Sequence, residues 1–265
     1  MSAPGSSFAL SGATALVTGG SAGIGLAAAR RLHARGARVV ICARGEERLR
    51  AAATSIGDER VLAVRADATV AEDLDRVHAT AVEAFGPVGV LVNNVGTALR
   101  GPFLELTDEQ WQQDLDIKLF SAIRLSRHML RGAVASGGGG RIINVLSTGG
   151  KHPAGGSAPT SVTRAAGLAL TKVLSKEFAP HGVLVNAVCV GIIRSAQHDD
   201  RHAAGDGSES IDEFYLRLAR QRGTPLGREG QADEVAAVIE LLASEDGGYV
   251  TGTAINVDGG AAPVL

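Results

Sequence analysis

The chain has 265 residues, of which 45% are hydrophobic, and a formal net charge of -2, so it is long enough to bury a full core in one domain. The nearly balanced charge argues against nucleic acid or an anionic membrane as the main partner and favours a small-molecule ligand. The only two cysteines, Cys42 and Cys189, lie in apolar runs and are expected to be buried, reduced thiols of a cytoplasmic protein.

Residues 1–10, MSAPGSSFAL, are expected to form a mobile N-terminal tail. They contain no basic segment followed by a long apolar core, so they do not resemble a secretion signal. No later run is long enough to span a membrane, and no membrane partner is expected. Residues 11–265 are therefore predicted to form a single domain.

Residues 13–25 read ATALVTGGSAGIG, an apolar strand that breaks into glycine and continues as a helix over residues 23–34. Glycine permits positive φ and close backbone approach, and a helix N-terminus offers free N–H groups to an anion. The stretch predicts a cradle for a diphosphate. Its G-x-x-x-G-x-G spacing differs from the common G-x-G-x-x-G fingerprint, so a glycine-rich turn without a ligand remains the alternative.

The rest of the chain alternates between apolar strands and helical patterns. Further strands are predicted at residues 38–43, 61–65, 88–93, 141–146, 184–188 and 253–257. Helices are predicted at residues 46–55, 70–85, 107–131, 160–178 and 232–243. A polar, irregular stretch at residues 194–223 has the character of a lid over a substrate. This order predicts an α/β fold: one Rossmann-type, doubly wound domain whose seven-stranded, mostly parallel sheet has helices on both faces.

In such a sheet the ligand lies beyond the carboxyl ends of the strands. The second strand ends at Arg44, which favours NADP(H) over NAD(H) because a guanidinium pairs with a 2′-phosphate. An ordinary solvated arginine is the alternative. Asp67 ends the third strand and is suited to accept a hydrogen bond from an adenine amino group. Residues 93–96 (NNVG) end the fourth strand, where short polar side chains and glycine let the backbone pass close to a cofactor.

These features occur together with VNAV at residues 185–188 and with PLGREGQADEVA and YVTGTAINVDGG near the C-terminus. Over residues 12–260 the chain resembles the short-chain dehydrogenase/reductase family. The resemblance implies an NAD(P)(H) cofactor, a small-molecule substrate and a homo-oligomer, either a tetramer or a dimer. It implies cofactor contacts from Gly19, Ser21, Gly23, Ile24, Gly25, Arg44, Asp67, Ala68, Asn94, Gly96, Arg164 and Ile193.

The catalytic positions depart from the family pattern. Typical members carry a serine, a tyrosine 13 residues later, a lysine four residues after that, and an asparagine on the long helix before the fifth strand. Ser147 matches the serine. Thr160 replaces the tyrosine and Arg164 the lysine; with the register set by Trp111, Lys118 replaces the asparagine. The candidate catalytic set is therefore Ser147, Lys118, Thr160 and Arg164.

The replacements change the available chemistry. The hydroxyl of Thr160 is a far weaker acid than a phenol and reaches less far. Arg164 lies one helical turn away and stays protonated, so it can bind ribose hydroxyls or a carboxylate but cannot relay protons. An ammonium at Lys118 in a desolvated pocket beside Arg164 would have a lowered pKa and could act as a general acid. A lysine that reaches solvent is the alternative.

Several other polar residues near these positions are weaker candidates. Lys151 and His152 follow Ser147 closely enough to line a pocket, and His152 titrates near neutral pH, although a loop histidine is the plainer interpretation. His198, Asp199, Asp200 and His202 could suggest a metal, but their segment resembles a solvated lid, and no metal is expected. Tyr215 in the lid could supply a phenol from a different element.

Two functions fit these observations. The first is an NADP(H)-dependent oxidoreductase of a carbonyl or alcohol, in which Ser147 polarises the oxygen and Lys118 or an ordered water completes proton transfer. The second is a protein of the same fold that binds nucleotide but is a non-redox enzyme or a regulatory or binding protein. The intact cofactor residues, with Arg44, Asp67 and Asn93 among them, favour the first, and the absence of the tyrosine and lysine favours the second.

Overall fold

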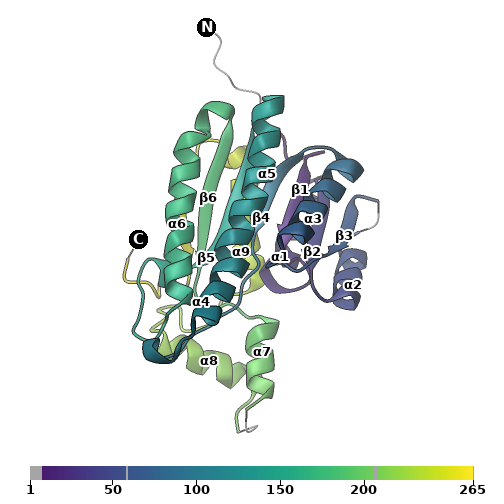
Figure 1. The fold of residues 1–265 in the computed structure, drawn as a ribbon. Coiled ribbons are helices and arrows are strands. Elements are labelled where there is room, and N and C mark those ends of the chain that lie inside the picture. The colour runs from purple at the N-terminus through teal and green to yellow at the C-terminus, as the bar shows by residue number, and fades with distance from the viewer. Residues whose placement is uncertain (1–7, 58, 206–207, 265) are drawn as a thin grey trace.

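The computed structural model describes residues 8–57, 59–205 and 208–264. Its centre is a sheet of seven parallel strands in the order β3-β2-β1-β4-β5-β6-β7 (Figure 1). The strands are β1 (Thr14–Thr18), β2 (Arg38–Ala43), β3 (Val61–Arg65), β4 (Val88–Asn93), β5 (Gly140–Ser147), β6 (Val183–Val190) and β7 (Ala254–Val257). The predicted doubly wound α/β fold is confirmed, and the described strand pairs are all parallel.

Helices cover both faces of the sheet because each strand is apolar on both sides. The residues buried on one face come from α1 (Gly23–Ala34), α2 (Glu46–Ile56) and α9 (Ala232–Ala243). Those on the other face come mainly from α3 (Ala71–Phe85) and α5 (Ser121–Ser136), and α6 (Thr160–Glu177) lies beside α5 over β5 and β6 (Figure 1). From β1 to β3 the strands are added on one side of β1, and from β4 onward on the other side, so the strand order reverses between β1 and β4, where such sheets bind ligands.

The single helix predicted over residues 107–131 is interrupted. A capping box of Thr107 and Gln110 starts α4 (Asp108–Leu115). The chain then widens into a π-helical segment, η2 (Asp116–Phe120), before α5 continues to Ser136. Periodicity cannot reveal this extra residue in the turn, because the flanking pattern stays amphipathic. Lys118 lies in the widened turn.

The lid is more regular than its sequence predicts. Residues 194–223 contain α7 (Ala196–Ala203) and α8 (Ile211–Gln221), so the expectation of an irregular stretch is wrong. Ser210 and Glu213 form a capping box at the start of α8. Phe214, Tyr215 and Leu218 form a small buried cluster along that helix. In Figure 1 both helices lie beyond the carboxyl ends of the strands.

The packed part of the chain begins earlier than expected. Of the predicted tail, residues 1–7 lie outside the described residues. Phe8 contacts the Arg141 guanidinium, with 4.4 Å between that group and the ring centroid, and Leu10 is fully buried in the core. The prediction of a mobile tail over residues 1–10 is therefore wrong for Phe8 and Leu10, because these two apolar side chains pack against the rest of the domain. Cys42 and Cys189 are buried and free, and no described helix is long and apolar enough to cross a membrane.

Candidate active site

The turn between β1 and α1 has the backbone geometry of an anion cradle. Gly19 has a φ of +65°, and a Cβ at Gly25 would collide with the carbonyl oxygen of Gly19. Asn94, at the end of β4, donates from Nδ2 to the carbonyl of Thr18 at 3.0 Å and braces the turn. No side chain caps the N-terminus of α1 at Ala22. The first N–H groups of α1 are therefore available to a ligand.

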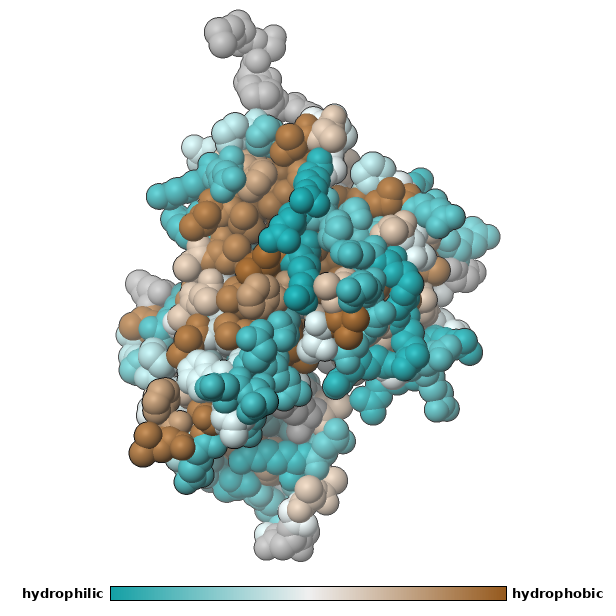
Figure 2. Space-filling view, viewed as in Figure 1, coloured by the Kyte–Doolittle hydropathy of each residue, from teal (hydrophilic) through white to brown (hydrophobic). Residues whose placement is uncertain are grey.

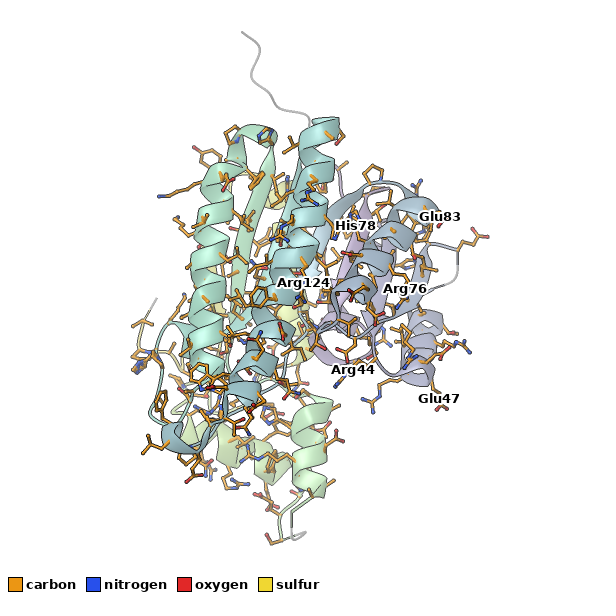
Figure 3. All side chains as sticks on the ribbon, viewed as in Figure 1. Arg44, Glu47, Arg76, His78, Glu83 and Arg124 are labelled. Carbon is orange, nitrogen blue, oxygen red and sulfur yellow. The ribbon has the colours of Figure 1, made fainter. Side chains whose placement is uncertain are left out.

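A cavity of about 270 Å³ opens beside this turn. Arg44 lies at the edge of the sheet where β1 and β2 end (Figure 3), and Arg48 also lines the cavity from the first turn of α2. Neither guanidinium bonds to a carboxylate of the described residues. Two unpaired guanidinium groups beside a glycine turn fit a phosphorylated dinucleotide. The lining includes Thr18, Gly19, Ser21, Ala43, Arg44, Arg48, Asp67, Ala68, Val95 and Ile117.

Asp67 lies in this cavity with part of its carboxylate already engaged. Its Oδ1 accepts from the backbone N–H and the hydroxyl of Thr69, at 2.9 and 2.8 Å. Asn93 does not serve the cavity as expected. It is buried, and its Nδ2 donates to Oδ1 of Asn144 at 2.8 Å, so the amide ties β4 to β5 inside the fold.

The other predicted cofactor residues lie in three places. Gly23, Ile24 and Gly25 start α1 beside the cavity. Gly96 lies against Arg164, whose Nη2 would be 2.7 Å from a Cβ at that position. Ile193 lies apart from the cavity, buried in the core and bridged to Gly230. Of the predicted cofactor residues, Gly19, Ser21, Arg44, Asp67 and Ala68 line the cavity. Arg164 lines a separate small cavity, with Gly96 against it, and Ile193 lies apart from both.

At the substrate end, Lys118 forms a buried ion pair with Asp114. The two side chains are 1% and 0% exposed, and Lys118 Nζ donates to Asp114 Oδ1. Lys118 Nζ also donates to the hydroxyl of Thr160 at 2.6 Å. The other oxygen of Asp114 accepts from the Thr163 hydroxyl at 2.7 Å. One carboxylate therefore holds Lys118 in place against the start of α6.

Burial changes the acidity of this lysine. The pKa of Lys118 is lowered to about 8, mainly by desolvation and to a smaller extent by the positive charges of Arg164 and Arg100. The hydrogen bond and charge of Asp114 oppose this shift. The ammonium therefore remains protonated at neutral pH but is a stronger acid than an exposed lysine. The alternative interpretation, in which the side chain of Lys118 reaches solvent, is therefore wrong.

Asp114 is the main residue that sequence reasoning missed. It is almost fully buried and bonds to Lys118 and Thr163, and the hydroxyl of Thr160 lies 3.5 Å from its Oδ1. The available signal was the Asp-x-x-x-Lys spacing, which places both side chains on one helical face. A surface pair gives the same signal, so the pattern alone could not show burial.

Arg164 is directed toward the end of β5. Its Nη1 donates to the carbonyl of Val145 at 2.8 Å, whereas its Nε is buried without a partner among the described residues. Burial lowers the pKa of Arg164, and the charge of Asp114 opposes this. A cavity of about 10 Å³ lies between Arg164 and Lys118, close to the smallest space that holds one water.

Ser147 ends β5 with its hydroxyl available. Its Oγ makes no hydrogen bond to any described residue, although it lies 3.4 Å from the position that a Cβ would take at Gly149. The hydroxyl of Ser161 lies 3.2 Å from that same position. Gly149 therefore leaves space beside the two hydroxyls. A free hydroxyl at this strand end can donate to a substrate oxygen.

The weaker candidates are engaged elsewhere. Lys151 does not line the site, because its Nζ donates to Ala254 O and to Asn256 Oδ1, both at 2.7 Å, on β7. His152 is exposed. The Tyr215 phenol donates to Asp199 at 2.8 Å, and burial raises its pKa to about 12, so it serves to hold α7 against α8. Within residues 8–57, 59–205 and 208–264, no group of three acidic, histidine or cysteine side chains is arranged to hold a metal.

Comparison with known proteins places this site in context. A family profile described as enoyl-(acyl carrier protein) reductase matches residues 19–262. A Streptomyces violaceoruber protein, assigned as ketoacyl reductase 1 of the granaticin polyketide synthase, is 39% identical over 254 residues, which cover 93% of this chain and 92% of that protein. Nearly the whole chain is therefore shared with this relative.

Two solved structures are similar over their full length. One is the NADPH-bound short-chain oxidoreductase of Pseudomonas aeruginosa PAO1 with an atypical catalytic centre. It is 35% identical with a TM-score of 0.89, and the match covers 97% of this chain and 100% of that one. The other is L-sorbose reductase of Gluconobacter frateurii in complex with NADPH and L-sorbose. It is 32% identical with a TM-score of 0.92, and the match covers 98% and 100% of the two chains.

Proposed function

The chain belongs to the short-chain dehydrogenase/reductase family, and we propose that it is an NADP(H)-dependent oxidoreductase of a carbonyl or alcohol group with an altered set of catalytic side chains. The observation that carries this proposal is the hydrogen bond from the buried Lys118 ammonium to the Thr160 hydroxyl. It places an acid where typical members of the family have a tyrosine. The NADPH-bound relatives support the choice of cofactor.

The proposed mechanism assigns a separate task to each side chain. The bound cofactor supplies or accepts the hydride. The Ser147 hydroxyl donates a hydrogen bond to the substrate oxygen and polarises the carbonyl. Thr160 Oγ1 gives its proton to that oxygen, directly or through one water, and takes a proton from Lys118 Nζ. Asp114 is a positioning residue, because it fixes Lys118 without touching the substrate.

The alternative function, nucleotide binding without redox chemistry, predicts a different outcome in one experiment. The purified protein is titrated with NADPH and NADH and then assayed against a panel of carbonyl compounds and alcohols at the nicotinamide absorbance. We expect binding with turnover. Binding without turnover across the panel would favour the alternative, and failure to bind either nucleotide would contradict the cofactor assignment.

We expect NADPH to bind about 10 to 100 times more tightly than NADH, because charge-assisted bonds to a 2′-phosphate contribute strongly. The double variant Arg44→Gln/Arg48→Gln should lose this preference and keep its affinity for NADH, as measured by calorimetric titration. Arg50→Gln is the matched control, because Arg50 lies on the same helix and pairs with Glu46 away from the cavity. A double variant that retains the wild-type preference would contradict the role of this pair.

The reduction should also depend on pH through Lys118. The protonated form is the active acid, and burial lowers the pKa of Lys118 to about 8. The kcat/KM for reduction should therefore be level below pH 8 and fall about tenfold per pH unit above it. Oxidation of the alcohol should rise through the same range, since it needs the neutral amine. NADPH affinity measured across the same pH range is the control, and level reduction up to pH 10 would contradict the assignment.

We further propose that the protein is a homo-oligomer in which a second copy covers the face of α5 and α6. An apolar groove of about 500 Å³ runs between these helices, and Figure 2 shows hydrophobic side chains gathered there. Val173 on α6 is 58% exposed in the isolated chain. Exposed apolar area of this kind favours association. Sedimentation velocity should give a dimer or tetramer, and a monomer at micromolar concentration would contradict the proposal.

We propose the cytoplasm as the compartment, on the basis of the cysteines. Cys42 and Cys189 are both buried and free, and burial raises the pKa of each thiol. Thiols in this state are typical of proteins in a reducing compartment.

A further inference from the structure

We propose that Lys151 is a positioning residue that holds the Ser147 hydroxyl in place for the reaction. Two hydrogen bonds from its side chain, here called the Lys151 bridge, join the loop after β5 to the last strand, β7. Lys151 lines neither the cofactor cavity nor the small cavity beside Lys118. The inference rests on the proposed function, because it assigns a residue that acts through Ser147, whereas the bridge itself is a feature of the fold.

The loop that carries Ser147 has little structure of its own. Ser147 ends β5, and the next residues form a short 3-10 turn, Thr148–Gly150, which contains two glycines. The backbone N–H groups of Lys151 and His152 close this turn by donating to the carbonyl of Thr148, at 3.0 and 2.9 Å. Glycine loses more backbone freedom on folding than any other residue. The orientation of Ser147 therefore depends on what holds the turn from outside.

The helix α6 holds one side of the turn. A Cβ at Gly150 would lie 2.9 Å from the backbone carbonyl carbon of Arg164, so the turn packs directly on the helix. Residues 152–156, which follow the turn, are all exposed. Lys151 is therefore the last residue that can hold the turn before the chain enters this exposed segment.

The Lys151 bridge holds the other side of the turn. Lys151 Nζ donates to the carbonyl of Ala254 and to Oδ1 of Asn256, both at 2.7 Å, and both acceptors lie on β7. Hydrogen bonds from an ammonium are roughly twice as strong as those between neutral groups. The turn is thus held between α6 and β7, and the bonds on the β7 side come from one side chain.

The register of the sheet shows how the bridge acts on Ser147. Ser147 pairs with Val190 of β6, and Val190 pairs with Val257 of β7. The Lys151 side chain meets β7 just before Val257, so β5, β6, β7 and the bridge form a closed ring of bonded segments that includes Ser147. A segment whose two ends are joined has less conformational freedom than an open loop. Breaking the bridge would give this freedom back to the Ser147 loop.

The C-terminal segment makes β7 a fixed point, although β7 is the edge strand of the sheet. Asn256 Nδ2 donates to the carbonyl of Val264 at 2.9 Å. The carboxylate of Asp258 accepts from the backbone N–H groups of Gly260 and Ala262, at 3.0 and 2.8 Å, and so folds the segment back toward the strand. The Asn256 amide therefore joins the bridge to this segment.

A double-mutant cycle of Lys151→Met and Ser147→Ala tests the role in the reaction. Lys151→Met should lower kcat for carbonyl reduction about tenfold, because a displaced hydroxyl polarises the substrate less well. The Kd for NADPH should change less than threefold. In the Ser147→Ala background the same substitution should change kcat less than twofold, because the hydroxyl that the bridge positions is absent. An equal fold-change in both backgrounds, or an unchanged kcat with Ser147 present, would overturn the proposal.

Two further variants separate this role from a structural one. A lysine beside an edge strand can serve only to keep other chains from pairing with it. Lys172→Met is the matched control, because Lys172 Nζ donates to the carbonyl of Gly252, directly before β7, from α6 and not from the Ser147 loop. It should leave kcat within about twofold of the wild type. Lys151→Arg keeps a cationic donor and should restore most of the activity; a rate as low as that of Lys151→Met would contradict the bridge.

Hydrogen exchange measured by mass spectrometry tests the bridge without turnover. The amides of residues 151 and 152 close the turn, and in Lys151→Met they should exchange about tenfold faster than in the wild type. In Lys172→Met they should exchange at the wild-type rate. Unchanged exchange in Lys151→Met would overturn the proposal. Faster exchange in a protein that reduces none of the carbonyl compounds would support the bridge and reject the reductase.

Discussion

Lys118→Met should lower kcat for carbonyl reduction about 10²- to 10⁴-fold, the range that a general acid contributes. The side chain of methionine is close to lysine in length and fills the same space, but it has no proton to give. The Lys118 ammonium lies 2.6 Å from the Thr160 hydroxyl and has no exposed surface through which solvent could readily replace it. Stopped-flow measurement of NADPH oxidation under saturating conditions gives the rate directly.

NADPH affinity separates this effect from general damage. The cofactor cavity beside Arg44 lies away from the Lys118 side chain, so the Kd for NADPH should change less than threefold while kcat falls. A parallel loss of NADPH binding would show that the variant is misfolded. Unchanged kcat with intact binding would rule out Lys118 as the proton donor.

Thr160 offers a matched pair of variants for the same proton path. Thr160→Ser keeps the hydroxyl and should retain most of the activity, whereas Thr160→Val keeps the shape and removes the group that accepts from Lys118. If both variants are equally active, the proton passes from Lys118 to the substrate without Thr160.

The fold was largely predictable because its signals are local. Apolar runs bounded by glycine and polar residues mark each strand, and the positions of β2, β3 and β4 agree with the prediction. Two of the errors lie where local pattern and tertiary structure differ. The π-helical segment at residues 116–120 changes one turn without changing the hydrophobic pattern. In the lid, many charged residues hide the short apolar stripe of α8.

Those parts of the candidate site were predictable in which the residue type and its position along the chain already indicate one role. Glycine in a strand-to-helix turn and arginine after the second strand indicate their roles without knowledge of the rest of the chain. Asp114 does not, because its role comes from what packs against it. A carboxylate in a helix is most often solvated, and only the contacts of Asp114 with Lys118 and Thr163 reveal otherwise.

Lys118→Met should also destabilise the fold, by about 3–5 kcal/mol, because it leaves Asp114 as a buried charge without its partner. Thr163 would still donate to that carboxylate, but one hydroxyl cannot replace an ammonium. Urea unfolding at pH 7 without nucleotide measures the change in free energy of unfolding. Turnover of this variant should therefore be compared at a temperature where it remains folded.

The double variant Asp114→Leu/Lys118→Met tests whether the pair is kept for stability or for catalysis. Replacing both charges with apolar groups removes the unpaired carboxylate, so unfolding free energy should recover to within about 2 kcal/mol of the wild-type value. Activity should not recover, since the proton donor is still absent. Recovery of stability without recovery of turnover would mean that this buried pair adds little to the fold and is retained because it holds an acid beside Thr160. A double variant as unstable as Lys118→Met would instead make the pair part of the structural core.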